Sequence, residues 1–349
     1  MSVVYEFRGN AYRGLSELDV WTNLLTEAPL EPELPIVDAH HHLWDDERGR
    51  YLLEDYLKDV NSGHNIRASV FVEAGAMYRN YGDIPSRPIG EVEFVNGIAA
   101  MSASGHYGIS KICAGIVGHA DLALGDYVRP VLENLVLAGN GRFRGIRHNL
   151  AWDTGNATKF NKFQAPPHLL LDKNFRKGFS NLYPLGLSFD AWQFHPQLPE
   201  LADLLSIFPD TSVILDHVGG LLGLSPHDFS RKDTFKIWQK SIENLSNFPN
   251  LSLKIGGLGM LYCNWDFHLR NKPPSSEELA AIWDPYIDVC LNAFGVDRCI
   301  MESNFPVDKQ SCGYGVLWNA LKRVTKNYSL SERTSLYHDN AVRFYRLEL

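Results

Sequence analysis

Short runs of apolar residues recur along the chain, separated by longer segments whose apolar positions follow a helical period. Runs that are nearly continuous in apolar character and alternate with helices are typical of parallel strands buried on both faces. Eight such units predict an α/β fold, the (β/α)8 or TIM barrel, with an open doubly wound sheet as the alternative. The predicted strands cover residues 36–40, 68–73, 113–118, 143–147, 187–190, 212–217, 251–255 and 299–302.

The segments around these runs predict the domain organisation. Residues 1–33 are expected to form an N-terminal extension, with a short helix near residues 17–26, packed on a single barrel domain at residues 34–349. The connections after the second and fourth strands are long, and long connections in a compact domain are usually functional or disordered. The predicted helices cover residues 91–101, 127–138, 198–208, 233–247 and 276–293, and two more close the chain within residues 316–349.

Composition and charge exclude several classes of protein. Of the 349 residues 45% are hydrophobic and 21% charged, as expected of a globular protein. A net charge of -8 offers no electrostatic footprint for nucleic acid or an anionic membrane, and no apolar run has the length of a membrane helix. Five scattered cysteines without a CxxC pair, and no visible secretory signal, predict a cytoplasmic chain with reduced thiols.

The first predicted strand ends in the sequence Asp-Ala-His-His-His at residues 38–42. In a regular strand, alternate side chains share a face, so Asp38, His40 and His42 are expected to point one way and His41 the other. Two imidazoles at such spacing can hold one metal ion or one substrate oxygen. A histidine-rich surface turn is the alternative, because a lone His-x-His is a weak signal.

The other seven predicted strands also end in, or lead to, polar residues. A closed barrel brings the carboxyl ends of all its strands onto one face, where residues far apart in sequence meet. We therefore expect these side chains to surround one site. In chain order they are Glu73, His119, Arg147 with His148, Asp190 with His195, Asp216 with His217, Lys254, and Glu302 with Asn304.

Three of these stretches resemble the amidohydrolase superfamily. They are residues 38–42, the Leu-Asp-His-Val-Gly-Gly of residues 215–220, and the Glu-Ser-Asn-Phe-Pro-Val-Asp of residues 302–308. The chain is most similar to the amidohydrolase-2 branch of TIM-barrel metal-dependent hydrolases, over about residues 30–345. That branch includes sugar-acid lactonases of the L-fuconolactonase type and the pyrone-dicarboxylate lactonases.

The resemblance implies a set of metal ligands and one departure from the family pattern. His40 and His42 match the first-strand pair of the family, and His217 matches its sixth-strand histidine. Asn304 falls where most members have an aspartate, and an amide is neither a base nor a strong ligand near neutral pH. The fourth-strand lysine of the two-metal members is not seen. One divalent metal, zinc first, or none is therefore expected, since pyrone-dicarboxylate lactonases are regarded as metal-independent.

Roles for the remaining candidates follow from their positions. Arg147, rather than Arg144 on the opposite face, is predicted to anchor a substrate carboxylate, with a salt bridge to an outer helix as the alternative. Glu73 is expected to contact substrate or to hold a histidine ring. Substrate contacts are also predicted for His119, His148, Asp190, His195 and Lys254, although His195 could cap a helix.

The eighth strand and its loop offer two carboxylates that could replace the missing aspartate. Glu302 could act as the base, or form an ion pair with Lys254 on the neighbouring strand. Asp308 is the other candidate base, and it could equally cap a loop. With His217 and Asn304, these two complete the predicted catalytic set.

These features predict a hydrolase of a small cyclic ester, a lactone of a sugar acid or of an aromatic-degradation product. The imidazoles, directly or through one metal ion, would polarise the carbonyl, and His217, Glu302 or Asp308 would activate water. The substrate is expected to bear a carboxylate, and a homodimer is considered. The alternatives are a decarboxylase or hydratase of the same branch, or a small-molecule-binding barrel impaired by Asn304.

Overall fold

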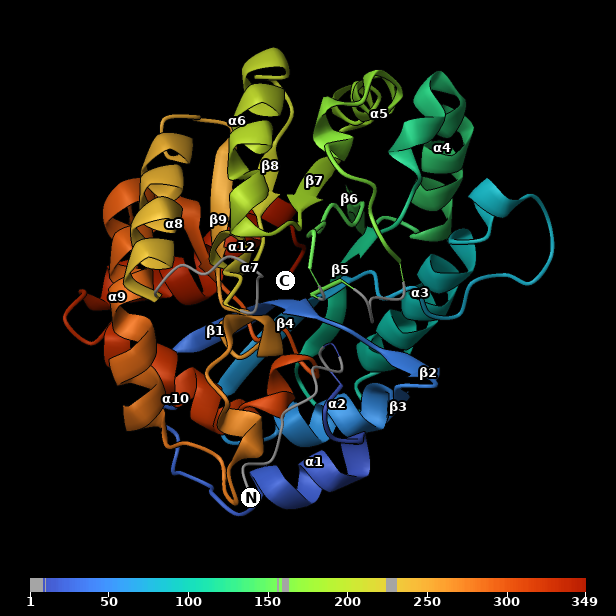
Figure 1. Cartoon of the computed structure of the whole chain (residues 1–349). Coiled ribbons are helices and arrows are strands. Elements are labelled where there is room, and N and C mark those ends of the chain that lie inside the picture. The colour runs from blue at the N-terminus through green and yellow to red at the C-terminus, as the bar shows by residue number, and fades with distance from the viewer. Residues whose placement is uncertain (1–8, 10, 156, 159–162, 224–230) are drawn as a thin grey trace.

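The computed structural model describes residues 9, 11–155, 157–158, 163–223 and 231–349. Within these residues, eight parallel strands pair in chain order into one sheet that curls into a barrel, as the sequence predicted (Figure 1). The strands are β1 (Pro35–His41), β4 (Asn65–Val72), β5 (Lys111–Gly118), β6 (Phe143–Arg147), β7 (Ser188–Ala191), β8 (Val213–Leu215), β9 (Leu251–Ile255) and β10 (Cys299–Met301).

Helices surround the barrel, and a two-stranded hairpin, β2 (Trp44–Asp46) with β3 (Gly49–Tyr51), follows β1. The N-terminal helix is shorter than predicted, and the closing segment contains more helical pieces than the two expected. The helices are α1 (Leu15–Thr22), α2 (Leu53–Val60), α3 (Ile89–Ala103), α4 (Arg129–Ala138), α5 (Lys173–Phe179), α6 (Leu198–Ile207), α7 (His217–Gly220), α8 (Arg231–Leu245), α9 (Ser276–Phe294), α10 (Tyr314–Val324), α11 (Leu330–Thr334), the π-helix Ser335–Asp339 and α12 (Asn340–Tyr345).

Two apolar layers follow from the alternation of side chains along the strands. A small cluster that includes Val37, Val70 and Ile214 fills the inside of the barrel. A larger cluster packs the outer faces of the strands against the helices, through residues such as Phe71 and Leu253. Strands buried on both faces explain why each of them reads as a nearly continuous apolar run.

The C-terminal segment closes the barrel at the amino ends of the strands. Tyr345 and Leu347 belong to the inner apolar cluster, and Arg346 donates to the carbonyls of Arg144 and Gly186 at the beginnings of β6 and β7. The C-terminus accordingly lies near the centre of the ring of strands in Figure 1. The opposite end of the barrel, at the carboxyl ends of the strands, is not closed by this segment and is where a site can form.

The barrel closes between its first and last strands through loop residues. The backbone N–H of Asn304 donates to the carbonyl of His40, and that of His42 donates to the carbonyl of Phe305, both at 2.8 Å. Asp38 reinforces this junction by accepting from the backbone and hydroxyl of Ser303 and from two tyrosine hydroxyls, of Tyr56 on α2 and Tyr314 on α10. The Phe305–Pro306 peptide is cis.

The prediction that Asp38 shares a face with His40 and His42 is wrong. The pairing of β1 with β4 shifts register between Asp38 and His41, so a bulge interrupts the alternation. Asp38 therefore points to the outer helices, while His40 and His42 point into the barrel mouth. His41 faces the helices as predicted, with its ring stacked on Tyr56 at 4.1 Å between centroids.

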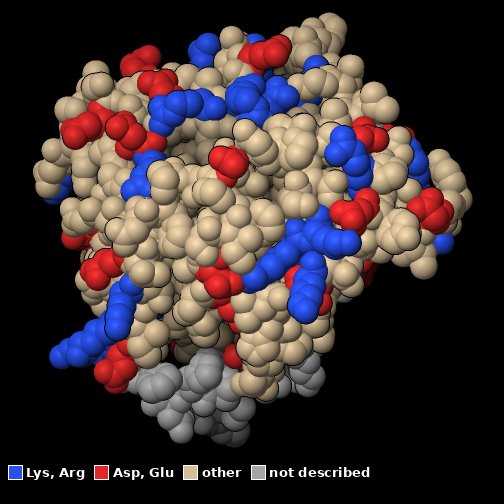
Figure 2. Space-filling view, turned by 90° about the horizontal axis from the view of Figure 1, so that it is seen from above, with Lys and Arg blue, Asp and Glu red and all other residues tan. Residues whose placement is uncertain are grey.

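Charged side chains, helix lengths and cysteines are the features on which the composition bears. In the view of Figure 2, basic and acidic side chains are scattered among uncharged ones. Among the described helices, none has the length and apolar character needed to cross a membrane. The five cysteines are free and buried.

Candidate active site

A cavity of about 310 Å³ lies at the carboxyl ends of the strands. Five of the predicted site residues line it, contributed by five different strands or the loops after them: His42, Glu73, Arg147, His217 and Asn304. Aromatic side chains from the connections after β1, β7 and β9 also line it: Trp44, Trp192 and Tyr262. The barrel thus brings together residues that are up to 262 positions apart.

His40 and His42 face each other at the base of the cavity. Their Nε2 atoms are 3.2 Å apart, and His42 Nδ1 donates to the carbonyl of Val72 at 2.8 Å. Because a carbonyl only accepts, the proton of the neutral His42 ring is on Nδ1 and Nε2 keeps its lone pair. Burial lowers the pKa of both imidazoles well below the usual value, so both are neutral near pH 7.

Glu302 connects two of the candidate histidines. Its Oε1 is 2.6 Å from His217 Nδ1, and its Oε2 is 2.9 Å from His40 Nδ1. The carboxylate is fully buried and does not line the cavity. It therefore holds the proton of His217 on Nδ1 and leaves Nε2 as the basic nitrogen of a ring that lines the cavity.

The turn that carries His217 explains the glycines around it. His217, Val218 and Gly219 have positive φ angles, so the chain reverses sharply after β8. A Cβ on Gly257 would lie 2.5 Å from the His217 ring, and one on Gly256 would lie 2.3 Å from Glu302 Cγ. The Gly-Gly pair after β9 thus provides the space in which the His217 and Glu302 side chains meet.

Arg147 faces the barrel interior, as predicted, and joins Glu73 to His40. Its Nε donates to Glu73 Oε1 at 2.8 Å, and its Nη1 lies 3.1 Å from His40 Nε2. Burial alone would lower the pKa of Arg147, but Glu73 and Asp216 outweigh that effect and raise it. The guanidinium is therefore a fixed positive charge at the cavity wall.

Lys254 is buried in the barrel with two carboxylates. Its Nζ is 2.7 Å from Asp190 Oδ2 and 2.9 Å from Asp216 Oδ1, and Asp190 also accepts from the Tyr345 hydroxyl at 2.7 Å. The predicted pairing of Lys254 with Glu302 is thus replaced by these two partners. Neither Lys254 nor Asp190 lines the cavity, so the structure does not place them for the substrate contacts predicted.

Asn304 and Asp308 form one unit on the loop after β10. Asn304 Nδ2 donates to Asp308 Oδ1 at 2.7 Å, and Asp308 Oδ2 accepts from the backbone N–H of Gly259 at 2.8 Å. Burial raises the pKa of Asp308 to about 7. Asp308 does not line the cavity, so it orients the amide and joins two loops, in line with the loop-capping alternative.

The remaining candidates lie away from the reaction cavity. His119 and His148 line a second, neighbouring cavity. His195 accepts from the backbone N–H of Leu222 at 3.1 Å and lines neither cavity. Sequence reasoning missed Ala11 and Arg13 of the N-terminal extension, which form part of the reaction-cavity wall and carry no motif that would reveal it.

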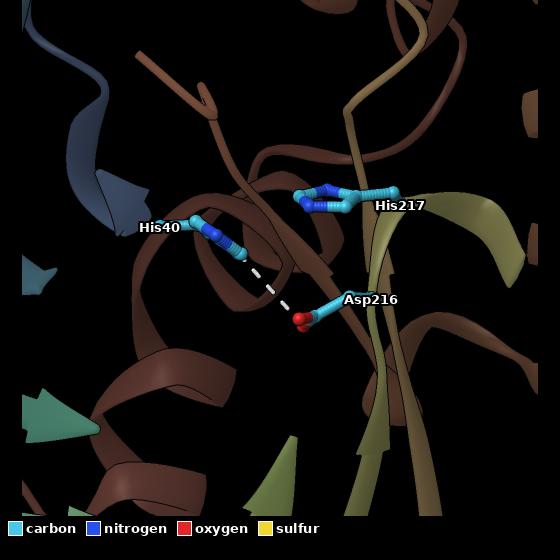
Figure 3. A group of neighbouring side chains, drawn as sticks. All are labelled: His40, Asp216 and His217. Atoms are coloured by element: carbon cyan, nitrogen blue, oxygen red, sulfur yellow. Dashed lines mark ion pairs between the residues drawn. The ribbon is translucent and has the colours of Figure 1, made fainter. Parts of the chain in front are cut away.

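One group of described His, Cys, Asp or Glu side chains is spaced to hold a metal ion: His40, Asp216 and His217, within 4.8 Å of one another (Figure 3). Asp216, adjacent to His217 in its motif, is the member that the predicted ligand set lacked. Lys254 Nζ, however, lies 2.9 Å from Asp216 Oδ1 and 3.1 Å from His40 Nδ1. A fixed ammonium already contacts two of the three ligands, so this deep group does not fit a divalent ion.

The edge formed by His40 Nε2 and His42 Nε2, which are 3.2 Å apart, is also spaced for a metal ion. Two nitrogens at about 2.1 Å from a tetrahedral zinc are about 3.4 Å apart, close to what His40 and His42 show. Asn304 Oδ1, a further neutral donor, is 3.3 Å from His42 Nε2. For a divalent ion to bind at this edge, Arg147 would have to give up its 3.1 Å contact with His40 Nε2.

The chain matches known proteins along most of its length. The family model described as amidohydrolase matches residues 37–347. The y4mH protein of Sinorhizobium fredii is 33% identical over 90% of this chain and 99% of its own length. The L-fucono-1,5-lactonase of Burkholderia multivorans is 25% identical over 89% of this chain and 96% of its own length.

A solved structure shows the same fold. A crystal structure of an amidohydrolase from Burkholderia multivorans with bound zinc superposes with a TM-score of 0.67 at 23% identity, covering 90% of this chain and 99% of its own. The barrel, the candidate site at the ends of its strands and the match over residues 37–347 agree. The chain therefore belongs to the amidohydrolase family.

Proposed function

We propose that the chain hydrolyses the lactone of a small hydroxy acid. The observation that carries this proposal is the pair of His217 and Glu302, a buried carboxylate bound to the Nδ1 of an imidazole that lines a cavity. This is the arrangement that a general base requires near neutral pH. The similarity to L-fucono-1,5-lactonase of Burkholderia multivorans supports a cyclic ester as the substrate class.

In the proposed reaction, water attacks the lactone carbonyl and gives its proton to His217 Nε2. Glu302 stabilises the imidazolium that forms, through the 2.6 Å contact with Nδ1. The tetrahedral intermediate then collapses, the ring C–O bond breaks, and His217 returns the proton to the leaving alkoxide. The product is the open-chain hydroxy acid, and the base is regenerated.

The developing negative charge on the carbonyl oxygen needs a positive partner. Arg147 supplies a fixed charge at the cavity wall, held there by Glu73. A zinc ion, when bound by His40, His42 and Asn304, would add Lewis-acid polarisation of the same oxygen. Trp192, edge-on to the His217 ring at 4.9 Å between centroids, holds the base against the apolar wall.

The test is hydrolysis of a panel of sugar-acid and dicarboxylate lactones. Turnover is measured as the release of acid at constant pH. We expect turnover of at least one lactone and a fall of about 10²–10⁴-fold in kcat for His217→Asn. The exposed His106 provides the matched control, His106→Asn, which should match the wild type. Absence of turnover across the whole panel would refute the proposal.

A further inference from the structure

A second chamber of about 580 Å³ adjoins the reaction cavity. The two share Glu73, Asn149 and Phe163 in their walls, and Asn149 Nδ2 donates to the carbonyl of Phe163 at 2.8 Å. A ligand that reacts beside His217 can therefore extend past Phe163 into the chamber. The chamber is formed by the connections after β4, β5 and β6.

Each of the two histidines of the chamber has one ring nitrogen in a hydrogen bond to the backbone. His119 Nδ1 donates to the carbonyl of Arg147 at 3.1 Å, so Nε2 is the nitrogen of this ring that can accept from a ligand. His148 Nδ1 accepts from the backbone N–H of Leu122 at 3.3 Å, which puts the proton of that neutral ring on Nε2 as a donor. The pair thus offers one acceptor and one donor.

Other polar groups of the chamber also combine both hydrogen-bonding roles. The Tyr78 hydroxyl and Arg87 Nε are buried and have no hydrogen-bond partner among the described residues. Asp121, of opposite charge to Arg87, lines the same chamber. Buried polar groups without partners cost free energy unless a ligand or water satisfies them. Mixed donors and acceptors suit hydroxyl groups, which both donate and accept.

Aromatic rings line the chamber, and one of them, Phe163, also lines the reaction cavity. The Phe163 ring is parallel to that of His119, at 1°, and nearly parallel to that of Tyr78, at 19°, with centroids 6.2 and 6.1 Å away. Aliphatic side chains, among them Ile84, Pro88 and Leu169, cover other parts of the wall. Apolar walls with a few directed polar groups are typical of a small-molecule site.

We propose that this chamber binds a hydroxyl-rich ring linked to the lactone, so that the preferred substrate is the lactone of a disaccharide acid. The inference rests on the proposed lactone hydrolysis for its reacting end. The binding of the second ring rests on the chamber alone.

Binding of the open-chain acids tests the chamber without turnover. Isothermal titration would compare gluconate with the disaccharide acids maltobionate, cellobionate and lactobionate. We expect at least one disaccharide acid to bind the wild type at least tenfold more tightly than gluconate. Tyr78→Phe, which removes one hydroxyl, and Ala123→Trp, which fills the chamber, should each reduce that ratio toward one. Tyr127→Phe, at a tyrosine 86% exposed, is the matched control and should keep it.

The outcomes separate this inference from the proposed function. If no disaccharide acid binds more tightly than gluconate, or if the ratio survives in Ala123→Trp, the chamber does not bind a second ring. If the ratio behaves as expected but no lactone is hydrolysed, the chamber inference stands and the proposed reaction fails. If simple lactones are hydrolysed but no larger acid is preferred, the proposed reaction stands and the chamber inference fails.

Discussion

The substitution Glu302→Gln tests the charge that the proposed mechanism needs. Glutamine has the same shape as glutamate. Its carbonyl oxygen can still accept from His217 Nδ1, which lies 2.6 Å from Glu302 Oε1 in the wild type. Its amide group would face His40 Nδ1, where Oε2 lies at 2.9 Å. The geometry of both rings is thus retained, while the negative charge opposite the imidazolium is lost.

The size of the effect follows from that charge. Two unit charges about 4 Å apart interact by about 4 kcal/mol at an effective dielectric constant of about 20. Each 1.4 kcal/mol or so changes a rate tenfold, so kcat should fall about 10³-fold. KM should change little, because Glu302 is fully buried and does not line the cavity.

The assay is acid release from a lactone that the wild type hydrolyses, with the melting temperature measured alongside. Glu277→Gln makes the same change at an exposed position of α9 and should leave kcat unaltered. A folded Glu302→Gln protein with kcat within tenfold of the wild type would refute the assignment of His217 and Glu302 as base and partner.

Three further predictions concern stability and metal binding. Lys254→Met leaves Asp190 and Asp216 without their cation, so the free energy of unfolding measured in urea titrations should fall by about 3–5 kcal/mol. Lys173→Met, at an exposed position, is the control and should leave the free energy of unfolding unchanged. Burial raises the pKa of Glu91 to about 8. Between pH 4.5 and 8 the unfolded chain therefore releases a proton that the folded chain keeps, so the free energy of unfolding falls as pH rises. The melting temperature of Glu91→Gln minus that of the wild type should therefore increase from pH 5 to pH 8. A difference that stays constant over this range would contradict the prediction. Asn304→Asp, which adds a carboxylate beside His42 Nε2, should retain more zinc after dialysis, and unchanged zinc content by elemental analysis would argue against a metal at that edge.

The strands and the ring of polar residues could be predicted because both are local properties of the sequence. Each strand is an apolar run, and each run ends in a side chain of recognisable chemistry. The bulge in β1 could not be predicted, because it arises from the register of Asp38 and His41 against β4. Strict alternation therefore misplaced Asp38 while it placed His41 correctly.

Pairing within the site was beyond the reach of sequence. An ion pair of Lys254 with Glu302 on the next strand was the alternative to a substrate contact, yet the long lysine side chain reaches Asp190, two strands away. The contact of His217 with Glu302 depends on the space beside Gly256 and Gly257, and no local pattern in the sequence indicates that contact. The second chamber depends on loop conformations that no local pattern encodes.

The closure of the barrel has a consequence for how its site can move. β1 and β10 meet through backbone bonds made by His40, His42, Asn304 and Phe305, so the junction is built from the residues beside the reaction cavity. Any opening of this junction would separate the histidines from Asn304. Closure of the barrel and assembly of the site therefore depend on the same hydrogen bonds. Protection of the His42 and Asn304 amides against hydrogen exchange would report the integrity of both.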